Sequence, residues 1–341
     1  MTVHRPRGVA VAGCRIGFVG AGGVARRHAG MLAEFDDTRL ISVTDVDPDR
    51  ARSFATDFGL RAVPDAQAVL DSGVDAVYVC VPPFAHGPVE LRVAEAGAAL
   101  FVEKPLGLDA ATAETIAERL EQTGVVASVG HHWRYSPAVG WAREVLADHD
   151  VRLLMGAWLD KIPPVSWWAN RSRSGGQVIE QAIHVLDLAR LLVGEVAEVH
   201  AFADGRPPDS PGTTDFDVDG ATVANLRFRD GAVGTLAATC LLRWKHRAGL
   251  EICADGLALT LTEDALEMRN GDAAPQMRPI DPEGAKRAAD RAFVDAVLGR
   301  GEDLRTPYSD ALRTHRLACA IARSAREGAP VRLPEAHDVL R

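Results

Sequence analysis

In the first part of the chain, short apolar runs alternate with longer amphipathic segments. The apolar runs are rich in β-branched residues and lie at residues 15–20, 40–45, 76–81 and 99–104. Strands that are apolar on both faces are typical of a parallel sheet with helices on each side. The segments between them have the periodicity of helices and lie at residues 24–35, 47–59, 87–97 and 109–124. This β-α alternation predicts a doubly wound parallel sheet in an α/β fold.

The pattern changes after about residue 134. Strand-like runs then follow one another with little helix between them, at residues 152–160, 197–204, 221–230, 232–242, 249–255, 257–262 and 265–269. Turn dipeptides such as Asp255-Gly256 separate several of these runs and favour antiparallel hairpins. One helix is predicted within the series at 175–194, and two more close the chain at about 285–298 and 309–326.

Composition and charge exclude some classes of protein. Lys and Arg number 38 against 47 Asp and Glu, so the formal net charge is -9, and 47% of the residues are hydrophobic. This profile is typical of a soluble globular protein. A net negative charge disfavours nucleic acid or an anionic membrane as a partner, and no apolar run is long enough to predict a membrane span. The five cysteines are far apart, which favours free thiols in a reducing cytoplasm.

A glycine-rich turn joins the first predicted strand to the first predicted helix. Its sequence is Gly20-Ala21-Gly22-Gly23-Val24-Ala25, a Gly-x-Gly-x-x-Ala pattern. Gly20 would allow the tight turn, Gly22 the close approach of a pyrophosphate, and Ala25 the contact between helix and strand. The pattern predicts a dinucleotide site. The alternative interpretation is a plain glycine turn.

The second strand ends at Asp45, and no arginine follows it directly. A carboxylate at this position would accept hydrogen bonds from the adenosine ribose and would repel a 2′-phosphate, which favours NAD over NADP. Asp47 is the competing carboxylate, because it precedes Pro48 and could instead cap the next helix.

These elements predict two domains in a chain of 341 residues. Residues 1–134 are expected to form an NAD-binding Rossmann domain, with a doubly wound parallel sheet. Residues 135–341 are expected to form a C-terminal α+β domain with a large open, mostly antiparallel sheet that serves substrate binding and oligomerisation. Because the predicted helices are too few to cover both faces of that sheet, we expect a homodimer or homotetramer.

Three further strings complete a resemblance that spans nearly the whole chain. They are FVEKP at 101–105, GHHWRYSP at 130–137 and SGGQVIEQAIHVLDLARLLVG at 174–194. With the glycine turn, they resemble the Gfo/Idh/MocA family of nicotinamide-dependent oxidoreductases. The resemblance implies an enzyme that uses NAD to interconvert a secondary alcohol and a ketone on a sugar, a sugar derivative or a cyclitol such as inositol.

The resemblance also implies the catalytic residues. Lys104 lies in the Glu103-Lys104-Pro105 triplet, and the family's Asp-x-x-x-His motif appears as Glu180-x-x-x-His184, in which a longer carboxylate replaces Asp. Hydride removal from a carbinol needs a base for the hydroxyl proton and a donor for the developing alkoxide. We favour His184 as the base and Lys104 as the donor, and a deprotonated Lys104 is the alternative.

A continuous helix would place Glu180, His184 and Asp187 on one face. A carboxylate beside the imidazole would raise the pKa of His184, so oxidation would become faster as the pH rises through the imidazole range. The alternative is an exposed polar helix face. The Glu180 and His184 pair could also bind a metal ion, but no third ligand stands in a telling position, and no metal is expected.

Other residues are assigned to the cofactor and the substrate by position. The expected cofactor-binding residues are Gly20, Gly22, Gly23, Val24, Ala25, Asp45, Pro82, His86, Glu103 and Lys104. The expected substrate-binding residues are Lys104, Arg134, Trp167, Trp168, Glu180 and His184. Tryptophan faces stack on the C–H faces of sugar rings, although Trp167 and Trp168 could equally form a core pair. His131 and His132 are neighbours on a segment expected to be extended, so at most one should enter the cleft.

Two other functions remain open. One is a glycosidase that keeps NAD bound and oxidises a ring carbon transiently, and the other is a non-catalytic sensor of sugar or NAD. The presence of Lys104 and His184 argues against the sensor. Release of free sugar without net NADH would identify the glycosidase.

Overall fold

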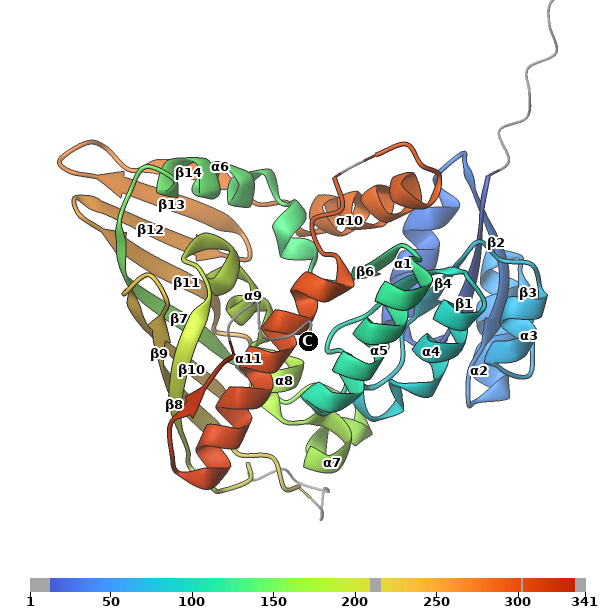
Figure 1. The fold of residues 1–341 in the computed structure, drawn as a ribbon, viewed down its shortest axis with the longest axis horizontal. Helices are drawn as coiled ribbons and strands as arrows, with labels where there is room; N and C mark the ends of the chain where they lie inside the picture. Colours follow the sequence, from blue (N-terminus) through green and yellow to red (C-terminus); the bar gives the residue numbers. More distant parts are fainter. Residues whose placement is uncertain (1–12, 209–215, 302, 335–341) are drawn as a thin grey trace, which may run out of the picture.

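The computed structural model describes residues 13–208, 216–301 and 303–334. Within these residues the chain forms a six-stranded sheet and a nine-stranded sheet, which lie on opposite sides of the molecule in Figure 1. The long helix α11 (Tyr308–Glu327) runs between them. The predicted combination of a Rossmann sheet and a second, open sheet is confirmed.

The first sheet is parallel in every pairing between its described strands. Its order is β3 (Arg61–Ala62), β2 (Thr38–Thr44), β1 (Cys14–Val19), β4 (Ala76–Val79), β5 (Ala99–Val102) and β6 (Ala127–Val129). This is the strand order of a dinucleotide-binding Rossmann fold. The connecting helices are α1 (Gly23–Ala33), α2 (Pro48–Phe58), α3 (Ala66–Asp71), α4 (Pro88–Glu95) and α5 (Ala110–Thr123). The short elements β3, α3 and β6 were not predicted.

Local capping explains where these helices begin. The Asp47 carboxylate accepts the backbone N–H groups of Asp49 and Arg50, and Pro48 occupies the first turn of α2. Asp109 caps α5 in the same way, by accepting the N–H of Thr112. Side chains of this kind satisfy amide groups that a helix leaves without an internal partner.

The second sheet is mostly antiparallel, as predicted. Its order is β14 (Gln276–Pro279), β13 (Ala265–Asn270), β12 (Leu257–Thr262), β11 (Arg247–Ala254), β7 (Val151–Lys161), β10 (Val233–Leu242), β9 (Ala221–Phe228), β8 (Val196–Ala203) and β15 (Val331–Arg332). Among the described strands of this second sheet, only β7 and β10 pair in parallel. The terminal strands β14 and β15 were not predicted.

The two faces of this sheet differ. Alternate residues of β9 are buried and exposed. The buried face of the sheet packs against the helices α6 (Pro137–Leu146), α9 (Ile183–Leu192) and α11. We call the opposite side the outer face. It exposes the apolar side chains of Leu153, Met155, Phe202, Val223, Val233 and Leu241. Cross-strand pairs such as Phe202 with Val223 place these side chains beside one another.

The predicted boundary at residues 134 and 135 separates the two sheets but not their helices. Helix α10 (Pro282–Val297) packs against the Rossmann sheet, where Phe293 and Val294 join the core around β1. Helix α11 contributes Leu312 to a second Rossmann core and Ile321 to the core of the large sheet. The C-terminal helices therefore hold the two domains together.

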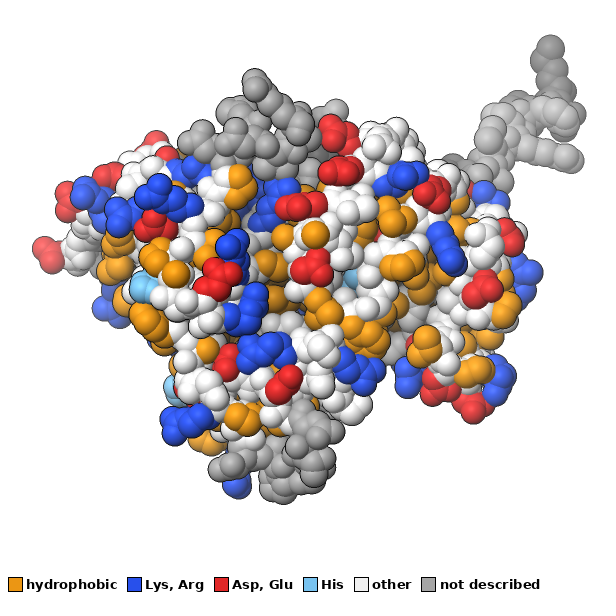
Figure 2. Space-filling view, turned by 60° about the horizontal axis from the view of Figure 1, so that its bottom comes forward, with side chains coloured by type: hydrophobic (Ala, Val, Ile, Leu, Met, Phe, Trp, Pro, Cys, Tyr) orange, Lys and Arg blue, Asp and Glu red, His pale blue; other side chains and the backbone are white. Residues whose placement is uncertain are grey.

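Acidic and basic side chains lie intermixed among apolar ones on the face that Figure 2 brings forward. No helix among the described residues combines the length and apolar character needed to cross a membrane.

We predict that a second copy of the chain covers the outer face, because six exposed apolar side chains form a patch of the kind that marks interfaces. Light scattering at micromolar concentration should give at least twice the chain mass of 36.5 kDa. Val223→Lys should lower that mass, whereas the matched charge Ala111→Lys, on the exposed side of α5, should not. A wild-type mass near 36.5 kDa would contradict the prediction.

Candidate active site

Lys104 lies just beyond β5, at the carboxyl edge of the Rossmann sheet, where doubly wound folds bind their ligands. Its ammonium donates to the backbone carbonyl of Glu180 at 2.7 Å and to the Glu180 Oε1 at 3.0 Å. An ammonium has three protons, so these contacts leave one for a ligand. The contact also joins the edge of the first domain to the second.

The predicted helix at 175–194 is interrupted. The structure has a short helix α8 (Gln177–Glu180) and a separate helix α9, with Gln181 and Ala182 between them. In a continuous helix the carbonyl of Glu180 would accept the amide N–H of His184, but here it accepts the ammonium of Lys104. The expectation that Glu180 and His184 share one helix face is therefore wrong. Asp187 and His184, which are both on α9, do lie three residues apart on one helix.

His184 is buried among aromatic rings. The rings of Trp133 and Trp158 stack on it, with centroids 6.0 and 5.9 Å away. The rings of His131 and His132 approach it edge-on, at 5.9 and 5.2 Å. Both histidines therefore contact His184, against the expectation for an extended segment. The reason is that residues His132–Tyr135 form a 3₁₀ helix, η2, which brings neighbouring side chains to the same region.

The environment of His184 keeps its imidazole neutral. Burial, and then the positive charge of Lys104, lower the pKa of His184 well below its usual value. Burial likewise lowers the pKa of His132 to about 3. The expected rise in the pKa of His184 is wrong, because the Glu180 carboxylate pairs with Lys104 and Trp168. The Nδ1 atom of His184 is buried and has no hydrogen-bond partner among the described residues.

Glu103 holds the strand end that carries Lys104. Its Oε1 atom lies 3.0 Å from Nε2 of His28, whose Nδ1 lies 2.7 Å from Asp290 on α10. Although burial opposes it, Asp290 and then Glu103 raise the pKa of His28 to about 9. Burial likewise opposes the charge on Glu103, but His28 lowers the pKa of Glu103 to about 2. This buried cluster of opposite charges fixes the backbone immediately before Lys104.

The glycine turn fits a pyrophosphate. Gly20 has φ 97°, and a Cβ atom there would lie 2.3 Å from the carbonyl oxygen of Cys80. Gly22 is the N-cap of α1, no side chain caps that helix, and no atom lies within 4 Å of the place a Cβ would take. The first amides of the helix thus face open space, where a phosphate can bind them. Gly23 begins α1, Val24 is exposed, and Ala25 is buried against the core.

Asp45 has partners that the sequence did not indicate. Its Oδ2 accepts the N–H of Ala21 at 2.8 Å, and its Oδ1 accepts the N–H of Asp47 at 2.9 Å. Arg50 also donates to Oδ1, at 3.2 Å. Asp45 therefore stabilises the glycine turn through its contact with Ala21. Although no arginine follows Asp45 directly in the sequence, Arg50 contacts its carboxylate in the structure. Asp47 is the helix cap.

Pro82 and His86 flank the short 3₁₀ helix η1 (Pro83–Ala85) that follows β4. The side chain of His86 is wholly buried, and its Nδ1 lies 2.5 Å from Glu90. This pair fixes the loop after β4, so His86 lies beneath the surface of the loop. A direct contact of His86 with a cofactor stays a prediction.

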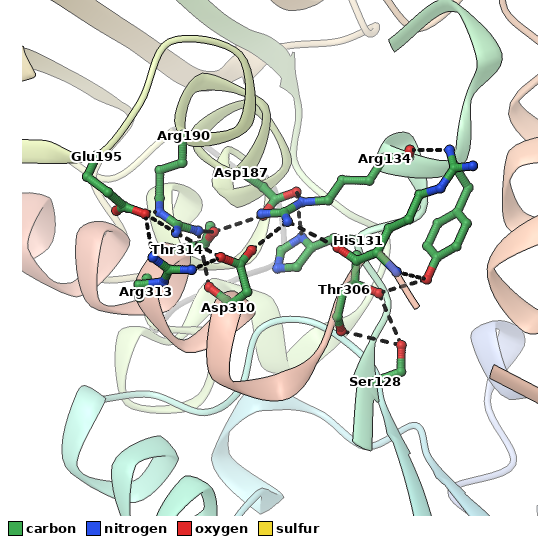
Figure 3. A network of polar contacts seen from close by, with 12 residues as sticks. Ser128, His131, Arg134, Asp187, Arg190, Glu195, Thr306, Asp310, Arg313 and Thr314 are labelled. Atoms are coloured by element: carbon green, nitrogen blue, oxygen red, sulfur yellow. Dashed lines mark hydrogen bonds and ion pairs between the residues drawn. The ribbon is translucent and has the colours of Figure 1, made fainter. Parts of the chain in front are cut away.

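Arg134 does not have a free guanidinium for substrate. It is 6% exposed and donates to both oxygens of Asp187, at 2.7 and 2.6 Å. Its Nη1 also lies 2.5 Å from Asp310, and Figure 3 shows how Arg190 and Thr314 extend this network. We therefore correct the expectation that Arg134 binds substrate. It joins η2 to α9 and α11.

The two adjacent tryptophans also depart from expectation. Trp168 is 0% exposed, packs against Val218 and Cys240, and donates its indole N–H to Glu180 Oε2 at 2.9 Å. Trp167 packs against the same cluster and is only partly buried. The core interpretation is thus correct for Trp168, which offers no free ring face to a sugar.

Several polar side chains near the site were missed. Gln177 and Gln181 lie close to Glu180 in the sequence and are buried. In the part of the chain that the structure describes, some of their amide atoms have no hydrogen-bond partner. The ammonium of Lys245 lies 4.4 Å from the ring centre of Trp158, one of the two tryptophans that stack on His184. Polar residues within an apolar helical segment were the available signal for the two glutamines. Within the described residues, no group of three or more His, Cys, Asp or Glu side chains is arranged to hold a metal ion.

Comparison with known proteins assigns the family. Residues 14–131 match the oxidoreductase family with the NAD-binding Rossmann fold, Gfo/Idh/MocA, and residues 139–258 match the C-terminal domain of the same family. The chain belongs to the Gfo/Idh/MocA family of oxidoreductases, and its first domain is the NAD-binding domain of that family.

Named relatives act on cyclitols and sugars. The chain is 32% identical over 228 residues to myo-inositol 2-dehydrogenase of Thermotoga maritima, which covers 65% of this chain and 67% of the relative. It is 30% identical over 304 residues to UDP-N-acetylglucosamine 3-dehydrogenase of Acidithiobacillus ferrooxidans, covering 89% and 90%. A solved structure of levoglucosan dehydrogenase with NADH has a TM-score of 0.85 at 22% identity, covers 95% of this chain and 100% of the other, and supports the fold.

We predict that Arg134→Met destabilises the protein by about 3–5 kcal/mol, because it leaves the buried carboxylate of Asp187 without its main partner. Urea unfolding measures the change. Replacing both residues, with Arg134→Met and Asp187→Leu, should recover a large part of the loss. Arg152→Met, which removes an exposed ion pair with Asp150, should leave the free energy of unfolding nearly unchanged. Similar small losses for Arg134→Met and Arg152→Met would contradict this account.

Proposed function

We propose that the protein is an NAD-dependent dehydrogenase that interconverts a secondary alcohol and a ketone on a sugar, a sugar derivative or a cyclitol. The observation that carries this proposal is the ammonium of Lys104, which Glu180 holds at the carboxyl edge of the Rossmann sheet. The buried imidazole of His184 lies near enough for the charge of this lysine to lower its pKa. Relatives named as inositol dehydrogenases, with 30 to 32% identity, support the substrate class.

The environment of the site suits a ligand with several hydroxyl groups. Gln177, Gln181 and His184 are buried and carry polar atoms that the described protein leaves without partners. Such atoms are costly unless a ligand or water pairs with them, and a polyol offers donors and acceptors at close spacing. The unpaired amide atoms of the two glutamines and the imidazole of His184 favour recognition through hydrogen bonds.

The proposed division of labour follows from protonation. NAD, held at the glycine turn from Gly20 to Ala25, would supply the hydride acceptor when bound. His184, kept neutral by burial and by Lys104, accepts the hydroxyl proton, directly or through water. Lys104 directs its remaining proton to the same oxygen and stabilises the developing alkoxide. Glu180 holds the ammonium in place and balances its charge.

We also propose that the enzyme works in the cytoplasm, which its five unpaired cysteines support. The NAD-retaining glycosidase is the outcome to be separated in the assay, because it would release a sugar without accumulating NADH.

We predict that a screen of inositols, hexoses, amino sugars and nucleotide sugars will find at least one substrate that produces NADH, followed by absorbance. NAD should be used at least about tenfold more efficiently than NADP, since repulsion of a 2′-phosphate by Asp45 amounts to roughly 1.4 kcal/mol or more. Asp45→Ala should relax this preference without abolishing turnover. Equal use of both cofactors would indicate that Arg50 compensates for Asp45, and no turnover with any polyol would sink the proposed function.

We predict that His184→Ala and Lys104→Met each lower turnover by about 10²-fold or more, while NAD binding survives His184→Ala. Because the pKa of His184 lies well below its usual value, the imidazole is already neutral at pH 6.5. Oxidation should therefore change little between about pH 6.5 and 8 and should fall only in more acidic solution.

The matched control is His149→Ala, which removes a partly buried histidine at the end of α6, where its Nδ1 contacts the Val145 carbonyl. This variant should keep the wild-type turnover and pH profile. A His184→Ala variant that does the same would remove His184 from the mechanism and leave Lys104 as the proton acceptor.

A further inference from the structure

Trp168 combines complete burial with a polar contact to the candidate active site. Its side chain is 0% exposed, and its indole Nε1 donates to Oε2 of Glu180 at 2.9 Å. The other oxygen of the same carboxylate, Oε1, accepts the ammonium of Lys104 at 3.0 Å. The order of contacts is therefore indole, carboxylate, ammonium.

We propose that Trp168 is a positioning residue for the reaction. Its indole N–H fixes the plane of the Glu180 carboxylate, and that carboxylate sets the direction in which Lys104 points its remaining proton. This inference rests on the proposed dehydrogenase function for its catalytic consequence. The hydrogen-bonded chain itself is testable without turnover.

The first step of the argument is the freedom of the carboxylate. The terminal torsion of a glutamate is broad, so a single hydrogen bond leaves the carboxylate free to rotate. Partners at both oxygens, Trp168 at one and Lys104 at the other, define its plane. The side chain of Glu180 is only 15% exposed, so loss of the indole N–H would leave Oε2 short of a partner in a confined place.

The second step is the rigidity of the indole. Trp168 packs against Val218 and Cys240, and its ring meets Phe216 at 61° with centroids 6.1 Å apart. This cluster belongs to the second domain, whereas Lys104 follows a strand of the first. The second domain thus holds the Glu180 carboxylate in place, and Lys104 of the first domain donates a hydrogen bond to that carboxylate.

The third step is side-chain length. An aspartate at position 180 would withdraw the carboxylate by one carbon–carbon bond, about 1.5 Å. Hydrogen bonds at 2.9 and 3.0 Å on opposite oxygens cannot both survive that withdrawal without movement of the backbone. The contact with Trp168 is therefore specific to a glutamate at this position, and Glu180→Asp is a suitable background in which to test it.

The kinetic test is a double-mutant cycle. Trp168→Phe should lower kcat by about tenfold or more and leave KM for NAD unchanged, because a hydrogen bond to a charged group is lost. In a Glu180→Asp background the same Trp168→Phe change should alter kcat by less than about twofold. Equal losses in both backgrounds would mean that Trp168 acts only through packing, and would overturn the proposal.

Val218→Ala is the matched packing control. It removes a buried side chain from the same cluster but leaves the indole N–H in place, so it should lower the thermal midpoint without changing kcat. If Val218→Ala lowers kcat as much as Trp168→Phe does, the proposal fails.

A second readout is independent of activity. The chain has six tryptophans, and in a ¹⁵N-labelled sample the indole resonance lost in Trp168→Phe assigns the one from Trp168. That resonance should move in Glu180→Gln and also in Lys104→Met, because the carboxylate contacts both groups. An unmoved resonance in Glu180→Gln would overturn the proposal. Absence of turnover in the wild-type enzyme would instead refute the proposed function. The resonances would still decide whether Trp168, Glu180 and Lys104 are linked by hydrogen bonds.

Discussion

The ion pair between Asp187 and Arg134 is the constraint on which the site depends. Both side chains are almost wholly buried, and a buried charge costs several kcal/mol unless it is paired and hydrogen-bonded. Burial opposes the charge on Asp187, but His131 and Arg134 lower its pKa below the usual value. Because the pair joins η2 to α9, and Asp310 ties both to α11 (Figure 3), it fixes His184 one helical turn away.

A second buried cluster performs the same task for Lys104 from the other domain. Glu103, His28 and Asp290 join the end of β5 to α1 and α10, so the strand that carries the lysine is tied to a helix from the C-terminal part of the chain. The charged side chains of each network pair within that network. Among the described residues, the buried atoms without a hydrogen-bond partner include amide atoms of Gln177 and Gln181 and Nδ1 of His184. A ligand with hydroxyl groups would supply partners for these atoms.

Patterns of short range predicted most of the fold. The alternation of apolar runs, the glycine turn and caps such as Asp109 depend on neighbours in the sequence, and they located the principal strands and helices. The errors arose where a distant partner decides. The predicted helix at 175–194 breaks where the ammonium of Lys104, 76 residues earlier, donates to the carbonyl oxygen of Glu180. Similarly, the guanidinium of Arg134 donates to Asp187, 53 residues later. No local pattern contains those contacts. For the same reason, the sequence did not indicate that α10, which follows the predicted boundary, packs on the Rossmann sheet.

The Glu180 carboxylate, which contacts Lys104 where the sequence predicted His184, shows why such contacts matter for the chemistry of the site. Beside His184, Glu180 would favour the imidazolium and leave a poor base at neutral pH. Beside Lys104, it favours the ammonium, while the stack of Trp133 and Trp158 and the nearby positive charge keep the imidazole neutral. A dehydrogenase needs these two opposite protonation states at neighbouring groups, one to accept a proton and one to stabilise an oxyanion. The helix breaks between α8 and α9, and Glu180, at the end of α8, contacts the lysine through both its carbonyl and its carboxylate.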